Sequence, residues 1–161
     1  MTAIVFFQRL AAPLLALLLL LVPPAVAADG VTRLPTEPLV IDMAGGGKVT
    51  FETEIADDDA ERSRGLMFRR SMQEHEAMLF IWPAPYEVGM WMRNTYIPLD
   101  MLFIAADGKI VHIARETVPH SLDVITAGQK VLAVLEISGG AAARFGISPG
   151  DQVRHRFFAA P

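Results

Sequence analysis

The sequence predicts an all-β domain, a mainly antiparallel β-sandwich or barrel that carries one or two short helices. Three observations support this fold class. About eight runs rich in β-branched and aromatic residues recur along the chain. Most connections between them are short and contain glycine or proline. Helical signals are confined to two short stretches, which leaves strands as the main elements.

Two strands and one helix are predicted in the first part of this domain. Residues 38–44 predict a strand, and residues 49–55 alternate apolar with polar side chains, as a half-buried strand does. Residues 56–66 break this alternation. Asp57 suits the N-cap of a short helix there, and Gly65 suits its end because glycine readily takes a positive φ.

The middle of the chain predicts a buried strand, a further strand and a hairpin. Residues 76–82 are apolar on both faces, which is typical of a strand deep in a sandwich. Residues 88–95 follow as another strand. Residues 101–114 contain two β-rich runs around Asp107 and Gly108, a residue pair favoured in two-residue hairpin turns.

The last part of the chain predicts two more strands and a helical turn. Residues 131–137 form an apolar strand, and residues 139–146 look like one or two helical turns that end at a glycine. A proline-glycine turn at residues 148–151 leads into a final strand, residues 152–158.

The N-terminus predicts export. In residues 1–27, Arg9 precedes an unbroken apolar stretch at residues 10–22, which is too short to cross a hydrocarbon core of about 30 Å as a helix. Small residues favour cleavage after Ala27, with Ala28 as the near alternative, so residues 1–27 are interpreted as a signal peptide. An uncleaved membrane anchor is the rival interpretation.

We therefore expect three parts: the signal peptide, a flexible lead-in at residues 28–37, and one β domain at residues 38–159. The mature protein is expected in the periplasm, as a monomer that touches the membrane only through the signal segment before cleavage. The chain has no cysteine, which excludes disulfides, thiolate metal sites and cysteine nucleophiles.

The charge balance argues against nucleic acid as a partner. Acidic residues outnumber basic ones, and the formal net charge is −4, whereas binding to phosphate backbones calls for a basic face. The sequence also lacks nucleotide-binding glycine loops and metal-binding histidine spacings. We expect neither a cofactor nor a metal.

The stretch GMWMRNTYIPLD suggests a binding site. Strand periodicity puts Met90, Met92 and Asn94 on one face and Trp91 with Arg93 on the other. An indole, a guanidinium and the nearby Asn94 amide could bind a small polar or anionic ligand, such as a sugar ring or a carboxylate. The structural alternative is a surface cation–π pair between Arg93 and Trp91.

Asp100 and Glu136 are carboxylates in apolar surroundings, where a charge is costly to bury unless it is paired. The structural interpretation joins them to arginines among Arg64, Arg69 and Arg93, so that Arg64, Arg69, Asp100 and Glu136 form a supporting polar shell. The functional interpretation makes Asp100 and Glu136 an acid/base pair of a hydrolase that acts on cell-envelope carbohydrate.

Methionine offers one more hypothesis. The thioethers of methionine are soft ligands that suit Cu(I). The candidates are Met67, Met72, Met78, Met90, Met92 and Met101. Most of them lie in apolar strands, where methionine commonly fills gaps in the core. We therefore assign no residue to a metal.

Several motifs resemble one known family. In chain order they are RGLMFR (64–69), AMLF (77–80), WMRNTYIPLD (91–100), DG (107–108), VLEI (134–137) and GISPGD (146–151). Together they resemble the bacterial and archaeal family called domain of unknown function 192, over residues 38–158. The resemblance implies a mostly antiparallel β fold of jelly-roll type and no known activity. Ala77 and Arg93 depart from its usual glycine and lysine.

These observations lead to three functional hypotheses. The first is an exported, non-catalytic module that binds a small ligand through Trp91, Arg93 and Asn94. The second is the carbohydrate hydrolase that would act through Asp100 and Glu136. The third is a structural protein-interaction domain.

Overall fold

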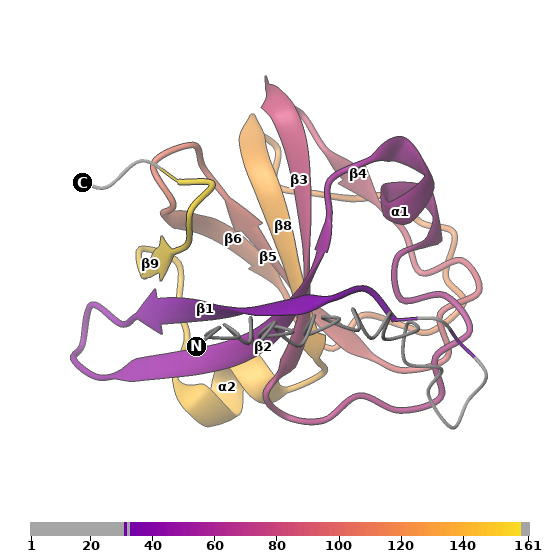
Figure 1. Ribbon diagram of the computed structural model, residues 1–161, viewed down its shortest axis with the longest axis horizontal. Coiled ribbons are helices and arrows are strands. Elements are labelled where there is room, and N and C mark those ends of the chain that lie inside the picture. The colour runs from indigo at the N-terminus through magenta and orange to yellow at the C-terminus, as the bar shows by residue number, and fades with distance from the viewer. Residues whose placement is uncertain (1–30, 32, 159–161) are drawn as a thin grey trace, which may run out of the picture.

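The computed structural model describes residue 31 and residues 33–158, which form a curled sheet with two short helices (Figure 1). In chain order the elements are β1 (Thr36–Asp42), β2 (Lys48–Ala56), α1 (Asp59–Arg64), β3 (Glu76–Tyr86), β4 (Gly89–Met90), β5 (Leu99–Ile104), β6 (Ile110–Ala114), β7 (Ile125–Thr126), β8 (Val131–Ser138), α2 (Ala141–Phe145) and β9 (Gln152–Arg154). The predicted signal segment lies outside the described residues. Among those described, no helix is both long and apolar enough to cross a membrane.

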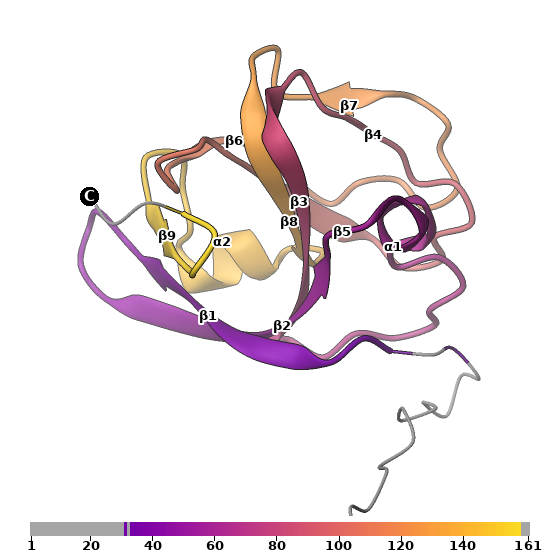
Figure 2. The same ribbon diagram turned by 45° about the horizontal axis from the view of Figure 1, so that its top comes forward.

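Seven strands form one sheet in the order β6-β5-β8-β3-β2-β1-β9, and β4 pairs with β7 beside it (Figure 2). Only the β2–β3 pair of this sheet is parallel. Parallel neighbours need a crossover, and the segment that contains α1 supplies it. The predicted class is therefore confirmed as mostly strands with two short helices, but the sheet is mixed and curled rather than a clear antiparallel jelly-roll sandwich.

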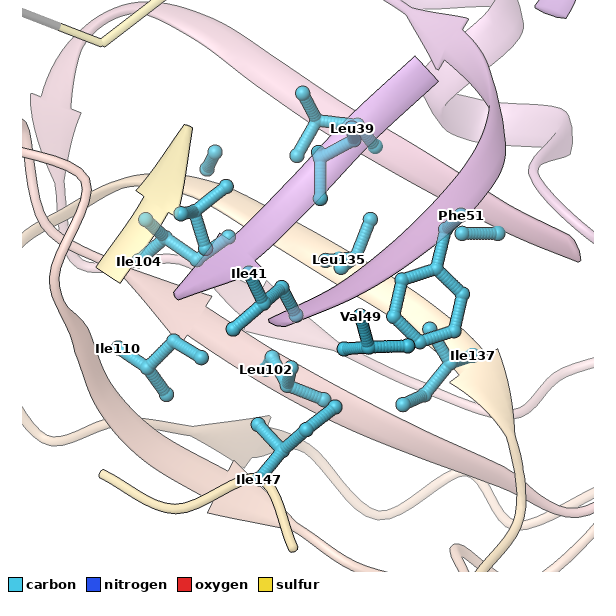
Figure 3. Packing of buried hydrophobic residues seen from close by; sticks show 14 of the residues in the cluster. Leu39, Ile41, Val49, Phe51, Leu102, Ile104, Ile110, Leu135, Ile137 and Ile147 are labelled. Atoms are coloured by element: carbon cyan, nitrogen blue, oxygen red, sulfur yellow. The ribbon is translucent and has the colours of Figure 1, made fainter. Parts of the chain in front are cut away.

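The two faces of the sheet bury two apolar clusters. Leu79 and Leu135 are cross-strand partners in the first, which Figure 3 shows around Leu39, Phe51 and Leu102. The second cluster contains Met78, Phe80, Met92, Met101 and Phe103. Burying a large apolar side chain contributes about 1.5–3 kcal/mol, so these clusters can hold a domain of this size without disulfides.

The predicted first helix is confirmed as α1. Its N-cap is Asp58 rather than Asp57, because the Asp58 carboxylate accepts a hydrogen bond from the Glu61 backbone N–H at 2.8 Å. The Glu61 side chain in turn accepts from the Asp58 backbone N–H, which completes a capping box. Gly65 ends the helix with φ +47°, and a Cβ there would lie 2.9 Å from the Phe80 ring.

The strand predicted over residues 88–95 is wrong beyond Met90. The Thr95 backbone N–H donates to the Met92 carbonyl, and Asn94 adopts a left-handed φ of +57°, so the chain turns instead of extending. The predicted facing of the side chains nevertheless holds for two of them. Met92 is fully buried in the second cluster, whereas Trp91 is 48% exposed.

The strand limits near both ends differ from the prediction. β1 begins at Thr36, inside the predicted lead-in, because Thr36 and Glu37 pair with β2. β9 ends at Arg154, since the Phe158 backbone N–H donates to the His155 carbonyl and turns the chain toward the first cluster. The hairpin around Asp107 and Gly108 is confirmed by the pairing of β5 with β6.

Candidate functional site

A pocket of about 270 Å³ lies between the end of α1, β4 and the segment that follows β4. We call it the α1–β4 pocket. Both ribbon views place α1 and β4 on the same side of the sheet (Figures 1 and 2). The lining of the pocket includes Arg64 and Gly65 from the end of α1, Trp91 and Arg93 after β4, and Glu136 from β8. The volume suits a small ligand rather than a large cofactor.

Glu136 lies in the lining of this pocket with its carboxyl group unpaired. On β8 its cross-strand partners are Met78 and Met101, so it lies on the face of the second cluster. Its side chain is buried and accepts no hydrogen bond from any residue that the structure describes. Burial raises the pKa of Glu136 to about 8, although the nearby Arg69 charge acts in the opposite direction.

This raised pKa predicts how stability depends on pH. The folded protein keeps the Glu136 proton up to about pH 8, whereas the unfolded chain releases it near the ordinary pKa of 4.5. Above pH 4.5 the unfolded state therefore binds fewer protons than the folded state. Glu136 should lower the free energy of unfolding as pH rises from about 4.5 to about 8, with a limiting slope of about 1.4 kcal/mol per pH unit.

Urea unfolding of the wild type and of Glu136→Gln, measured at several pH values, checks this expectation. The stability of Glu136→Gln relative to the wild type should increase through this window and then level off. A difference that stays constant with pH would show that Glu136 titrates alike in both states.

The rim of the pocket carries two arginines with unpaired guanidinium groups. Arg93 lies over the Trp91 ring, with 4.8 Å between its Cζ atom and the ring centroid. The side chains of Arg64 and Arg93 form no hydrogen bond or ion pair with another described residue. Arg62, by contrast, pairs with Asp59 at 2.5 Å and donates to the Ile81 carbonyl, so its charge is already engaged. Arg64 and Arg93 are thus the cations available to an anion.

Asn94 is not brought into the lining of the pocket. Its backbone carbonyl accepts a hydrogen bond from the Phe68 N–H at 2.8 Å, and its side-chain amide lies 3.9 Å from the Met67 sulfur. Asn94 therefore joins the turn after β4 to the segment after α1. Asparagine suits this place because it tolerates the left-handed conformation.

Asp100 has a structural environment far from that expected of a catalytic acid. It is fully buried and accepts hydrogen bonds from the backbone N–H groups of Glu116 at 2.7 Å, Gly140 at 3.1 Å and Ala142 at 2.9 Å. It does not line the α1–β4 pocket. The predicted arginine bridge is therefore corrected, because backbone donors from the start of α2 satisfy Asp100, and the structure does not place it beside Glu136 in one cleft.

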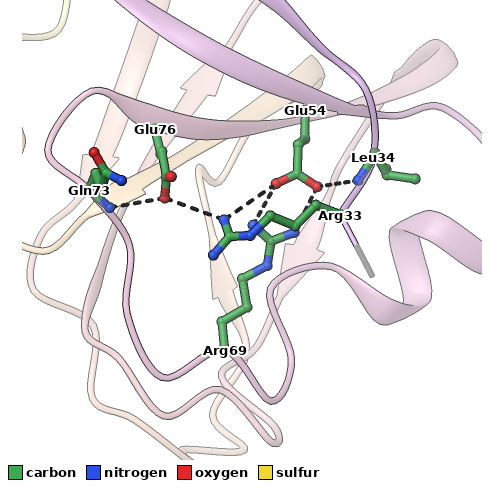
Figure 4. Close-up of polar contacts among 6 residues, drawn as sticks. All are labelled: Arg33, Leu34, Glu54, Arg69, Gln73 and Glu76. Atoms are coloured by element: carbon green, nitrogen blue, oxygen red, sulfur yellow. Dashed lines mark hydrogen bonds and ion pairs between the residues drawn. The ribbon is translucent and has the colours of Figure 1, made fainter. Parts of the chain in front are cut away.

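The buried arginine–carboxylate bridge joins Arg69 to Glu54 instead (Figure 4). Two hydrogen bonds of 2.5 and 2.7 Å connect the guanidinium and the carboxylate, and both side chains are at most 4% exposed. The Leu34 backbone N–H also donates to Glu54 at 2.6 Å. Of the predicted polar shell, only Arg64 and Glu136 line the pocket; Arg69 acts on Glu136 through its charge alone.

Sequence reasoning missed Glu54 and Trp82. Glu54 alternates with apolar residues in a strand that looks half solvated, yet it is buried and bonded to Leu34 and Arg69, which are distant from it in the sequence. Trp82 also lines the pocket. Because side chains alternate along the strand at residues 76–82, Trp82 lies on the same face as Met78 and Phe80. The sequence therefore did indicate the face on which Trp82 lies. The pairing of β3 with β8, which puts Glu136 on the same face, was not readable from the sequence.

Three of the methionines are core packing residues in this structure. Met78, Met92 and Met101 belong to the second cluster, and the Met92 sulfur accepts a hydrogen bond from the Thr117 hydroxyl at 3.1 Å. Within residues 31 and 33–158, no three His, Cys, Asp or Glu side chains gather into a group that could hold a metal ion.

Two solved structures are similar to this chain. A protein from Sinorhizobium meliloti 1021, described as a candidate transcription regulator, is 42% identical with a TM-score of 0.75, over 78% of this chain and 97% of its own. A protein of unknown function from Novosphingobium aromaticivorans DSM 12444 is 40% identical with a TM-score of 0.74, over 84% of this chain and 94% of its own. No curated protein shows significant similarity.

The family model agrees with the motifs noted in the sequence. Residues 40–155 match DUF192, domain of unknown function 192, which is described as an uncharacterized ACR. This match includes α1, the Trp91–Asp100 run and Glu136, and thus the whole lining of the α1–β4 pocket. The chain therefore belongs to the DUF192 family.

Proposed function

We propose that this protein is an exported, non-catalytic module that binds a small polar or anionic ligand in the α1–β4 pocket. One observation carries the proposal: a buried carboxyl group lines a pocket whose rim carries two arginines, and none of the three has a hydrogen-bond or ion-pair partner among the described residues. Buried polar groups in folded proteins normally have partners. A ligand that bonds to Glu136, Arg64 and Arg93 would explain why these three side chains lack partners within the protein.

The ligand also has an aromatic surface available. Trp91 is 48% exposed in the wall of the pocket, with Arg93 over its ring. An indole face with guanidinium donors beside it suits a sugar ring or another flat polar molecule. Recognition would thus combine stacking on Trp91 with hydrogen bonds to Arg93.

The alternatives receive less support. A two-carboxylate hydrolase needs two acids across one cleft, and Asp100 is held by backbone donors outside the pocket. The Sinorhizobium meliloti protein is described as a candidate transcription regulator. Nucleic-acid binding receives little support here, because this chain has 14 basic and 18 acidic residues, a balance that does not favour phosphate backbones.

Matched substitutions test the pocket. The chain has two tryptophans, so Trp82→Phe leaves Trp91 as the sole indole fluorophore. In that background, the emission should respond to acidic or neutral monosaccharides or short carboxylates. Arg93→Ala should weaken the response about tenfold or more, because a hydrogen bond to a charged group contributes about 1.5–3 kcal/mol.

Arg70→Ala is the matched control, because Arg70 is an exposed arginine over the Tyr96 ring at 5.6 Å and does not line the pocket. It should leave the response unchanged. Equal losses in Arg70→Ala and Arg93→Ala would locate binding outside the pocket, and a silent Trp91 throughout the panel would refute the proposed function.

A further inference from the structure

The charges around the α1–β4 pocket favour an anion over a cation. Among its lining residues, the arginines are Arg62, Arg64 and Arg93, while Asp59 and Glu136 are the acids. Asp59 is paired with Arg62. Two cations on the rim are thus unopposed unless Glu136 is ionised, and the apolar neighbours of Glu136 disfavour its ionised form.

Glu136 offers a hydrogen-bond donor in this protonated form. A protonated carboxyl group has one O–H donor and retains capacity as an acceptor. Its cross-strand partners, Met78 and Met101, provide no competing acceptor oxygen in their side chains. No residue among those described accepts a hydrogen bond from Glu136, so an atom that enters the pocket can accept this O–H.

We propose that the ligand is a small carboxylic acid that also bears an uncharged oxygen, such as a hydroxyl or carbonyl. Its carboxylate binds Arg64 and Arg93 at the rim, and its uncharged oxygen accepts the hydrogen bond of the Glu136 O–H. This inference rests on the proposed function of the pocket and narrows the ligand class within it.

Binding of such a ligand should depend on the protonation of Glu136. The charged groups that face it are Asp59, Arg62 and Arg64 from α1, Arg93 from the segment after β4, and Arg69 from the segment after α1. Affinity should therefore fall as pH rises above about 8, where Glu136 loses its proton.

Three sugars that share one ring and differ in charge test the ligand class. Glucuronate is an anion with several hydroxyl groups, glucose is its neutral counterpart, and glucosamine carries an amine. We expect glucuronate to bind most tightly to the wild-type protein, as measured by calorimetry, since Trp82 itself lines the pocket. Tighter binding of glucose or glucosamine would overturn the ligand class but not the binding function of the pocket. No binding of these sugars or of short carboxylates would contradict the proposed function itself.

Two substitutions test the role of Glu136. Glu136→Gln keeps an uncharged donor, so it should bind glucuronate at neutral pH and lose the decline at alkaline pH. Glu136→Ala removes the donor and should weaken binding about tenfold or more. Glu52→Gln, an exposed position on β2, is the control and should behave as the parent protein. If Glu136→Gln loses binding as Glu136→Ala does, Glu136 acts as an anion and the inference is wrong.

Discussion

Replacing Arg69 by methionine is expected to destabilise the protein by about 3–5 kcal/mol. Glu54 would keep its buried position near the Leu34 backbone but lose both guanidinium hydrogen bonds. Arg33 would still lie 4.0 Å from the Glu54 carboxylate, but its side chain is 24% exposed and replaces neither hydrogen bond of Arg69. The buried carboxylate must then either take up a proton or remain as a poorly compensated charge. Either outcome lowers the free energy of unfolding, which urea denaturation measures.

Two further variants make this prediction specific. Arg154→Met breaks a partly exposed ion pair with Asp42 and should lower stability far less than Arg69→Met does. Glu54→Leu/Arg69→Met replaces both partners with apolar side chains and should recover most of the loss. If the double variant is as unstable as Arg69→Met, the loss of stability comes from packing rather than from the unpaired charge of Glu54.

The second large effect is expected at Asp100. Asp100→Leu removes the acceptor of three backbone N–H groups, which belong to Glu116, Gly140 and Ala142. The Ala142 bond is buried, whereas those of Glu116 and Gly140 are partly buried. A buried donor left without a partner lowers stability by about 1–3 kcal/mol, so the loss should reach at least this range. Thermal and urea unfolding of this variant provide the measurement.

Asp100→Asn separates the structural role from a catalytic one. Asparagine keeps one acceptor oxygen, so the loss of stability should be clearly smaller than in Asp100→Leu. Because Asp100 does not line the α1–β4 pocket, this variant should respond to ligands as the parent does. An Asp100→Asn protein that is stable but silent toward ligands would place Asp100 in the functional site after all.

The candidate site shows which inferences a sequence supports. Alternation correctly assigned Met92 to the core and Trp91 to the outside, because side chains alternate even where the chain makes few ladder hydrogen bonds. The alternation rule failed at Asn94, because the chain turns there through a left-handed conformation and side chains no longer alternate between two faces. Asp100 and Glu136 were both identified as buried acids. Because both lie among apolar residues in the sequence, the sequence could not show that their environments in the folded protein differ.

By itself, the sequence determined the strand-rich class, α1, the hairpin at Asp107 and Gly108, and membership of the family, because these depend on residues close together in the chain. The tertiary structure alone decided that Glu54 bonds to Arg69, that Asp100 holds the start of α2, and that Glu136 enters a pocket with Arg64 and Arg93. Each of these contacts joins distant segments. Local composition sets whether a carboxylate is buried, but only strand pairing and the β2–β3 crossover set what it meets there.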